Sequence, residues 1–213
     1  MRNLLTCLLF ASLTTTFFAQ ESLKKVSVCE AVYEDFHAYP NFSETDLADL
    51  EHTATLADYD SKAEKIKLTG IIYETDGVTP ANDVIVYIEQ ANEEGEYEIH
   101  SHNDKNQVNH SATVKTDANG VYTFYTFVPG HTKEKLAYRR TQRAQHIHIM
   151  VKEQGKEVIE LPAFVFDIDW MVTKAYKKRL KKRGYDNVLT LVDNNGVLIA
   201  SKDIVLSDAQ ASK

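Results

Sequence analysis

Two histidines separated by a single residue, His146 and His148, are the side chains in this chain best placed to bind a metal ion. They lie in a hydrophobic, β-branched segment, and side chains two residues apart on a strand point to the same face, about 7 Å apart. A buried strand rarely holds two imidazoles unless hydrogen bonds or a metal satisfy their nitrogens. The pair alone supports a metal site and a hydrogen-bonded structural role equally.

The other candidate ligands favour oxygen and nitrogen over sulfur. Apart from Cys7 near the start, the one cysteine is Cys29, far from the histidines in sequence, whereas the chain has 11 tyrosines and 31 acidic residues. A phenol has a pKa of about 10, but a bound cation can ionise it. Phenolate and imidazole together favour a hard ion such as ferric iron over zinc or copper. Three further histidines, at positions 100, 102 and 110, fall in a polar segment and are expected to be exposed loop residues.

The first 19 residues have the pattern of a secretory signal. Arg2 supplies the positive charge, residues 4–18 are mostly apolar, and Ala19 is a small residue suited to cleavage. The apolar run is shorter than the roughly 20 residues of a membrane-spanning helix. We therefore expect a signal peptide over residues 1–19, a mature chain that begins at Gln20, and an exported protein, periplasmic or secreted, without stable membrane insertion.

Charge and cysteine content exclude two classes of protein. The chain has 24 basic and 31 acidic residues and a formal net charge of -7, whereas nucleic-acid binding needs a strongly basic surface. Cleavage of the signal would leave Cys29 alone, so no internal disulfide can form. An ordinary hydrophobic core or a metal must then hold the fold together.

Short β-branched and aromatic runs, separated by turn residues, dominate the chain from residue 65 onward. We expect strands at residues 66–73, 84–90, 112–115, 121–127, 146–152 and 158–166. Strands at this spacing indicate an antiparallel β-sandwich rather than alternating β and α units. The expected fold class is therefore all-β.

Helical patterns are expected on both sides of this core. Residues 46–51 are acidic and predict a helix in an N-terminal arm. Residues 172–183 predict a basic helix ended by Gly184, and an Asn-Gly turn at residues 193–196 predicts a hairpin. The expected division is a signal peptide at 1–19, an arm at 20–64, a sandwich core at 65–170, and a C-terminal helix and hairpin at 171–213 packed on the core.

Six fragments occur in a characteristic order between residues 66 and 166. They are Leu-Thr-Gly at 68–70, Val-Tyr-Ile-Glu-Gln-Ala-Asn at 86–92, Gly-Glu-Tyr at 95–97, Thr-Asp-Ala-Asn-Gly-Val-Tyr-Thr-Phe at 116–124, Thr-Phe-Val-Pro-Gly at 126–130 and Arg-Ala-Gln-His-Ile-His at 143–148. Each fragment is short, but their order and spacing resemble the intradiol ring-cleavage dioxygenases, the family of protocatechuate and catechol dioxygenases. The resemblance implies a β-sandwich, in agreement with the strand pattern.

The resemblance also implies a cofactor, one non-haem Fe(III) per chain bound by two tyrosines and two histidines. Tyr97, which follows the Gln-Ala-Asn and Gly positions, matches the first tyrosine of the family. His146 and His148 match its two histidines.

The second tyrosine is displaced or lost in this chain. Many members carry it two residues after Pro-Gly, where this chain has Thr132, and threonine cannot supply a phenolate. Tyr138, eight residues before His146, is the expected ligand if residues 131–137 are an insertion. Loss of the ligand and its replacement by His131 are the alternatives.

The resemblance implies a dioxygenase that cleaves a catechol-like aromatic with O2 to a cis,cis-muconate-type product, and the signal pattern implies that it is exported. In that reaction Tyr138 would leave the metal, and Arg143 would stabilise developing negative charge. Pro162 stands where larger members carry a substrate-side glutamine, so the catechol is not specified, and the oligomeric state is left open. The alternatives are a non-catalytic binding or envelope module of the same ancestry and a three-ligand site for another ion.

Overall fold

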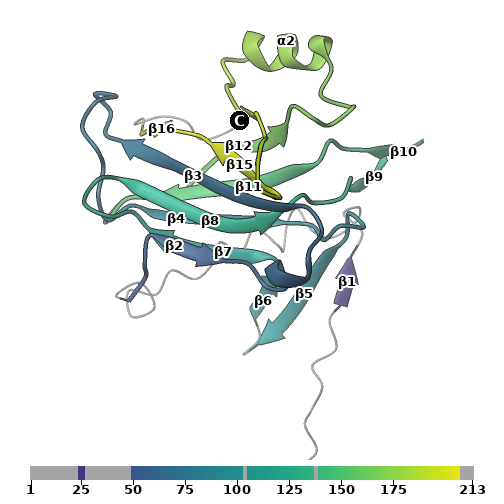
Figure 1. Ribbon diagram of the computed structural model, residues 1–213, viewed down its shortest axis with the longest axis horizontal. Coiled ribbons are helices and arrows are strands. Elements are labelled where there is room, and N and C mark those ends of the chain that lie inside the picture. Colours follow the sequence, from purple (N-terminus) through teal and green to yellow (C-terminus); the bar gives the residue numbers. More distant parts are fainter. Residues whose placement is uncertain (1–23, 27–48, 103–104, 137–138, 207–213) are drawn as a thin grey trace, which may run out of the picture.

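Two stacked β-sheets form the centre of the molecule (Figure 1). The structure is a computed structural model that describes residues 24–26, 49–102, 105–136 and 139–206. The expected signal peptide and Tyr138 lie outside these residues. Among the described residues, no helix is long and apolar enough to cross a membrane.

The first sheet has six strands in the order β14-β15-β3-β8-β2 with β16 attached to β3. Their bounds are β2 (Thr53–Thr55), β3 (Lys65–Tyr73), β8 (Val121–Phe127), β14 (Val192–Asn194), β15 (Val197–Ser201) and β16 (Ile204–Val205). The long central pair β3–β8 is antiparallel, whereas β2, β15 and β16 join it in parallel. The antiparallel expectation therefore holds for the centre of this sheet but not for its attached strands.

The second sheet has the order β13-β12-β11-β4-β7. Its strands are β4 (Ile85–Gln90), β7 (Ser111–Lys115), β11 (His146–Lys152), β12 (Ile159–Phe166) and β13 (Val188–Leu189). The strand with the two histidines, β11, is central and pairs antiparallel with both β12 and β4. A central position fixes both edges of β11 by hydrogen bonds, which makes it a rigid support for side chains.

Hydrophobic side chains from both sheets fill the space between them. Burial alternates along β3, as expected for a strand with one face on the core and the other toward solvent. The largest fully buried members of this core include Leu68, Phe124, Ile147 and Phe166. The expected all-β sandwich is confirmed.

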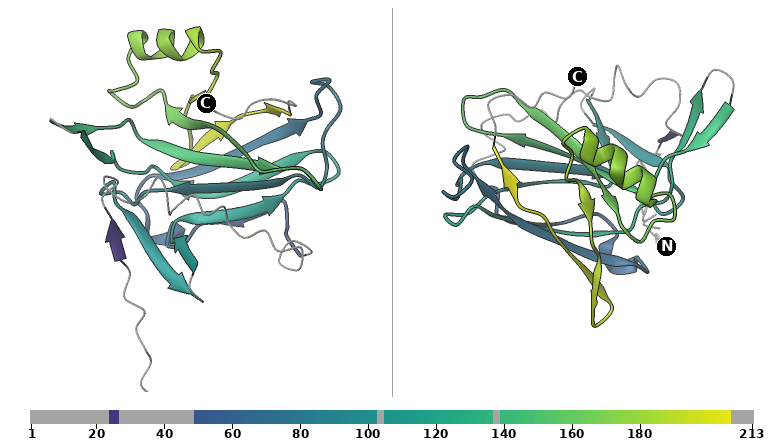
Figure 2. Two further views of the ribbon diagram at one scale, coloured as in Figure 1. Left: turned by 180° about the vertical axis from the view of Figure 1, so that it is seen from behind. Right: turned by 90° about the horizontal axis from the view of Figure 1, so that it is seen from above.

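A smaller three-stranded sheet lies beyond the sandwich, on the side away from the helix α2 (Figure 1 and Figure 2). It is built from β1 (Lys24–Val26), β5 (Tyr97–His102) and β6 (Lys105–Val108), and a separate hairpin pairs β9 (Lys133–Leu136) with β10 (Arg139–Gln142). The prediction of an exposed polar loop around residues 100–110 was wrong, because β5 and β6 pair antiparallel there. Ile99 and Val108 face each other in this pairing and are both buried.

The expected C-terminal helix is α2 (Lys174–Lys182). It begins at Thr173, whose hydroxyl accepts a hydrogen bond from the Tyr176 amide, and it is followed by Gly184 in the left-handed conformation. Tyr176 and Leu180 pack against a buried cluster that contains Val165 of β12. The helix therefore covers the β11–β12 side of the sandwich (Figure 2).

The Asn-Gly hairpin is also present, between β14 and β15. Asn195 and Gly196 both have positive φ, 54° and 85°, which is the conformation that a two-residue turn of type I′ requires.

The helix expected at residues 46–51 is not seen in its described part. Residues 49–51 form a turn and extended chain. The Glu51 and His52 carbonyls accept hydrogen bonds from the amides of Lys115 (2.9 Å) and Thr123 (2.8 Å). These carbonyls therefore bond to strands of the two sheets instead of forming helical hydrogen bonds. A short 3₁₀ helix, η1 (Tyr59–Ser61), follows in this part of the chain.

Candidate metal centre

The first two candidate ligands lie at the beginning of β11. The ring centroids of His146 and His148 are 4.9 Å apart with an interplanar angle of 77°. Ile147 between them is fully buried in the sandwich core. The alternation expected from the sequence therefore places both imidazoles together on the other face of the strand.

The third candidate ligand comes from the smaller sheet. Tyr97 is the first residue of β5, and its ring centroid lies 6.4 Å from that of His148. The tyrosine is only 5% exposed. The structure thus brings together three of the four expected ligands, Tyr97, His146 and His148.

The protonation state of His146 suits a ligand. Its Nδ1 lies 2.7 Å from the Ala144 carbonyl oxygen, which can only accept, so Nδ1 carries the proton and Nε2 keeps its lone pair. Burial lowers the pKa of His146 to about 3, and the neighbouring His148 and Arg143 act in the same direction. The imidazole therefore stays neutral at ordinary pH, which is the form that binds metals.

An acidic side chain stands behind His148. Oε1 of Glu160, on β12, lies 3.6 Å from Nδ1 of His148. This separation is an electrostatic contact rather than a hydrogen bond. Carboxylates that accept a hydrogen bond from a ligand imidazole orient the ring and raise its basicity, but Glu160 makes no such bond at this distance.

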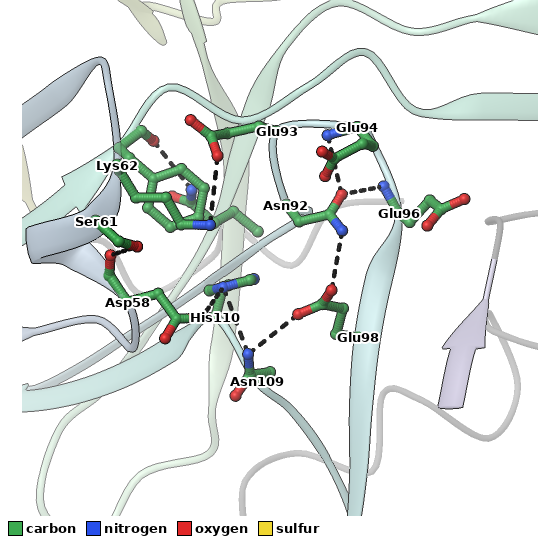
Figure 3. A network of polar contacts seen from close by, with 12 residues as sticks. Asp58, Ser61, Lys62, Asn92, Glu93, Glu94, Glu96, Glu98, Asn109 and His110 are labelled. Carbon is green, nitrogen blue, oxygen red and sulfur yellow. Dashed lines mark hydrogen bonds and ion pairs between the residues drawn. The ribbon is translucent and has the colours of Figure 1, made fainter. Parts of the chain in front are cut away.

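Asn92 fixes the turn that leads to Tyr97, as Figure 3 shows. The Asn92 side chain is buried, and its Oδ1 accepts hydrogen bonds from the amides of Glu94 (3.1 Å) and Glu96 (2.9 Å). Its Nδ2 donates to Oε1 of Glu98 (3.1 Å), the residue after Tyr97. One side chain therefore holds the backbone before the tyrosine and a side chain after it.

The same turn packs backbone to backbone against the loop that contains Pro-Gly. The Asn92 carbonyl accepts a hydrogen bond from the Gly130 amide (2.8 Å). Gly95 has a φ of +80°, and a Cβ at this position would lie 2.1 Å from the His131 carbonyl oxygen. Glycine is required here by both conformation and space, and the loop after β8 lies directly beside the Tyr97 turn.

Figure 3 shows that this network continues into the smaller sheet. Nδ2 of Asn109 donates to Oε2 of Glu98 (3.2 Å), while its Oδ1 accepts from Nε2 of His100 (2.6 Å). The next residue, His110, is buried, and its ring centroid lies 4.9 Å from that of Phe127 in a T-shaped arrangement. The prediction that His110 is exposed was therefore wrong.

The position expected for the second tyrosine is filled by a buried threonine. Thr132 is 1% exposed, and its Oγ1 has no hydrogen-bond partner in the described part of the chain. Its carbonyl accepts a hydrogen bond from the Arg143 amide (2.9 Å), so this loop lies next to the segment that leads to His146. Tyr138 lies outside the described residues, and its role as second ligand stays a prediction.

The alternative ligand His131 is engaged by a buried acid that the sequence did not suggest. Its Nε2 lies 3.1 Å from Oδ1 of Asp169, whose side chain has no exposed surface. The ring centroid of His131 also lies 5.8 Å from that of Trp170. The only signal for Asp169 was an Asp-Ile-Asp-Trp stretch between a strand and a helix, which is too common a pattern to single out.

The donor set fits a hard metal ion. Among the described residues, no three His, Cys, Asp or Glu side chains gather in a metal-binding cluster. The phenol of Tyr97 is a further oxygen donor beside the two imidazoles, and its ring centroid lies 6.4 Å from that of His148. A Tyr-His-His donor set, of which Tyr97 and His146 are buried, suits ferric iron better than zinc or copper. Fold and site together define a class of β-sandwich proteins in which a tyrosine and two histidines converge at the beginning of a central strand.

The sequence assigns the chain to a family within this class. Residues 38–179 match the profile of the family described as Dioxygenase. The chain therefore belongs to the intradiol ring-cleavage dioxygenase family. No curated protein sequence matches it.

Solved structures share the fold at low sequence identity. The dioxygenase domain of a dioxygenase carbohydrate-binding protein fusion from Streptomyces sp. SirexAA-E has a TM-score of 0.52 and 17% identity, over 73% of this chain and 87% of that one. Catechol 1,2-dioxygenase from Acinetobacter sp. ADP1 has a TM-score of 0.56 and 22% identity, over 73% of this chain and 57% of that one. Catechol 1,2-dioxygenase from Pseudomonas arvilla C-1 has a TM-score of 0.57 and 20% identity, over 76% of this chain and 58% of that one. This chain thus spans less than two thirds of either catechol dioxygenase.

Proposed function

We propose that the protein is an exported intradiol-type dioxygenase, which uses one non-haem Fe(III) to cleave a catechol-like aromatic with O2 to a cis,cis-muconate-type product. The observation that carries the proposal is the convergence of Tyr97, His146 and His148 in a member of this family. These three residues would hold the metal, with Tyr138 as the proposed fourth ligand.

The bound metal would supply Lewis acidity toward the two hydroxyls of the catechol and make the ring reactive toward O2. The bond between the two hydroxyl-bearing carbons breaks, and both oxygen atoms of O2 enter the product. Everything else required of the site falls to the protein, namely holding the ligands, excluding water and handling protons and charge.

Three properties of the chain serve those tasks. His146 is neutral and its ring is fixed by the Ala144 carbonyl, so it needs neither proton loss nor rotation to bind the metal. Arg143 brings positive charge close enough to depress the pKa of His146, and the same charge would stabilise the developing dicarboxylate. Tyr138, as a phenolate, would accept a proton from the catechol.

The test is iron content and product analysis on untagged protein loaded with Fe(III). We expect one iron per chain, a visible absorption band from tyrosinate on Fe(III), and a ring-opened product that takes up both atoms of isotope-labelled O2. His148→Ala should release the iron, whereas His52→Ala, at an exposed histidine elsewhere, should retain it.

Two results would contradict the proposal. Full iron occupancy in His148→Ala would remove that histidine from the site. Protein that stays colourless and binds no Fe(III) would favour the non-catalytic module, in which Thr132 marks the loss of a ligand.

A further inference from the structure

Asp169 is a buried carboxylate whose hydrogen bonds lead to the candidate metal centre. It follows β12, and both of its oxygens accept hydrogen bonds from N–H groups. Oδ1 accepts from Nε2 of His131 (3.1 Å) and from the Met171 amide (2.8 Å). Oδ2 accepts a short bond from the Gln145 amide (2.7 Å).

That Gln145 amide belongs to the same peptide group that holds His146. The peptide joins Ala144 to Gln145 and is trans, as are all described peptides, so its N–H and its carbonyl point in opposite directions. The N–H donates to Asp169 on one side, and the carbonyl accepts from Nδ1 of His146 (2.7 Å) on the other. Carboxylate, peptide and imidazole thus form one continuous hydrogen-bonded chain.

Hydrogen bonds in such a chain strengthen one another where water is excluded. A carboxylate at the N–H polarises the peptide and increases the negative charge on its carbonyl oxygen. A more negative carbonyl draws the Nδ1 proton of His146 more strongly and makes the opposite nitrogen a better electron donor. Direct carboxylate–histidine pairs behind metal ligands work in this way, and here one peptide group is inserted between the two partners.

We propose that Asp169 is a positioning residue that orients His146 and increases its electron donation through the Ala144–Gln145 peptide. The metal part of this inference rests on the proposed function, but the hydrogen-bonded chain does not. The same carboxylate also holds His131, so it ties the loop after the Pro-Gly turn to the beginning of β11. Asp169 thereby links the loop that contains Thr132 to the segment that leads to His146.

The first test uses the metal-free full-length protein and Asp169→Asn. This variant keeps the side-chain shape but removes the charge and places an amide against N–H donors. In nitrogen-15 NMR spectra we expect the His146 Hδ1 proton to move upfield and exchange faster, and the Gln145 amide to lose protection. Unchanged signals at both positions would overturn the hydrogen-bonded chain, whatever the protein does with iron.

The second test uses protein loaded with Fe(III). Loss of an outer-shell partner typically weakens metal binding about 10–100-fold, and we expect a loss of that size in Asp169→Asn. Weaker donation from His146 should also move the tyrosinate-to-iron band to longer wavelength and make the iron easier to reduce. An unshifted band in a variant that still binds iron would overturn the electronic role.

Two control variants separate this role from general packing. His131→Ala removes the side-chain contact of Asp169 but keeps its contacts to the Met171 and Gln145 amides, so its band should stay unshifted. Asp117→Asn alters another carboxylate that accepts backbone amides, in the exposed turn before β8, and should change neither iron binding nor the band. A band shift in His131→Ala as large as in Asp169→Asn would contradict transmission through the peptide. If the wild type bound no iron while the NMR changes appeared, the proposed function would fail and the hydrogen-bonded chain would stand.

Discussion

Replacing Asn92 by alanine should lower the free energy of unfolding by about 2–4 kcal/mol. The Asn92 side chain makes three hydrogen bonds, two from the amides of Glu94 and Glu96 and one to Glu98. Each is worth roughly 1 kcal/mol net, and a partner left buried without a bond costs about 1–3 kcal/mol. Glu94 is exposed, so water can replace its lost bond, which keeps the total near the sum of three ordinary bonds.

Urea unfolding of the wild type and of Asn92→Ala measures this difference. Asn82→Ala is the matched control, because Asn82 is exposed and bonds through its side chain to the neighbouring Asp83. We expect the control to lie within about 0.5 kcal/mol of the wild type. A loss below about 0.5 kcal/mol in Asn92→Ala would refute the view that this side chain holds the turn. Because the turn carries Tyr97, the iron-loaded variant should also show a broadened tyrosinate band.

Three further outcomes are expected. Burial lowers the pKa of His110 despite the nearby carboxylates of Glu98 and Asp58, with Lys62 acting in the same direction as burial. In the unfolded chain the His110 imidazole therefore binds a proton near pH 6.5, whereas in the folded chain it does so only at lower pH. The free energy of unfolding consequently decreases as the pH falls below about 6.5. His110→Gln should make the free energy of unfolding less dependent on pH in this range. Tyr138→Phe should keep iron, shift the visible band and slow ring cleavage about 10²–10⁴-fold, the range for loss of a general base, and an unchanged spectrum and rate would exclude this tyrosine. N-terminal mass analysis of the protein from its native host should find Gln20 first, and a retained Met1 would refute both cleavage and the proposed export.

The sandwich strands could be predicted from sequence because their information is local. Alternating apolar residues and the turns that bound them predicted β8 and β11 with the same first and last residues as in the structure. The Asn195-Gly196 pair predicted the β14–β15 hairpin. The attachments of β2, β15 and β16 were not predicted, since parallel pairing joins segments far apart in the chain and leaves no local turn signal.

The smaller sheet escaped prediction for a different reason. Its strands are rich in His, Asn, Glu and Lys, which are typical of loops. They are held by side-chain hydrogen bonds from Asn92 and Asn109 to Glu98 and by burial of Ile99 and Val108. Such contacts form only once the chain has folded, so they cannot be predicted from residue type.

The candidate site likewise has residues that could be predicted from the sequence and one that could not. Strand periodicity paired His146 with His148, and the resemblance to the family added Tyr97; the structure brings all three together. Asp169 could not be found from sequence, because its importance depends on a peptide group contributed by another segment.

The ligands come from two parts of the molecule with different resistance to local unfolding. His146 and His148 lie on a central strand, whose amides should exchange with solvent only when the whole domain opens. Tyr97 begins a small outer sheet, which we expect to detach in smaller, more frequent openings. A metal bound to all three residues would bind only while the outer sheet is packed against the sandwich. It would therefore stabilise the packed state and make those openings rarer, and the effect would grow with the metal's affinity. Iron loading should therefore slow hydrogen exchange in β5 and β6 far more than in β11, and iron loss should begin at the tyrosine.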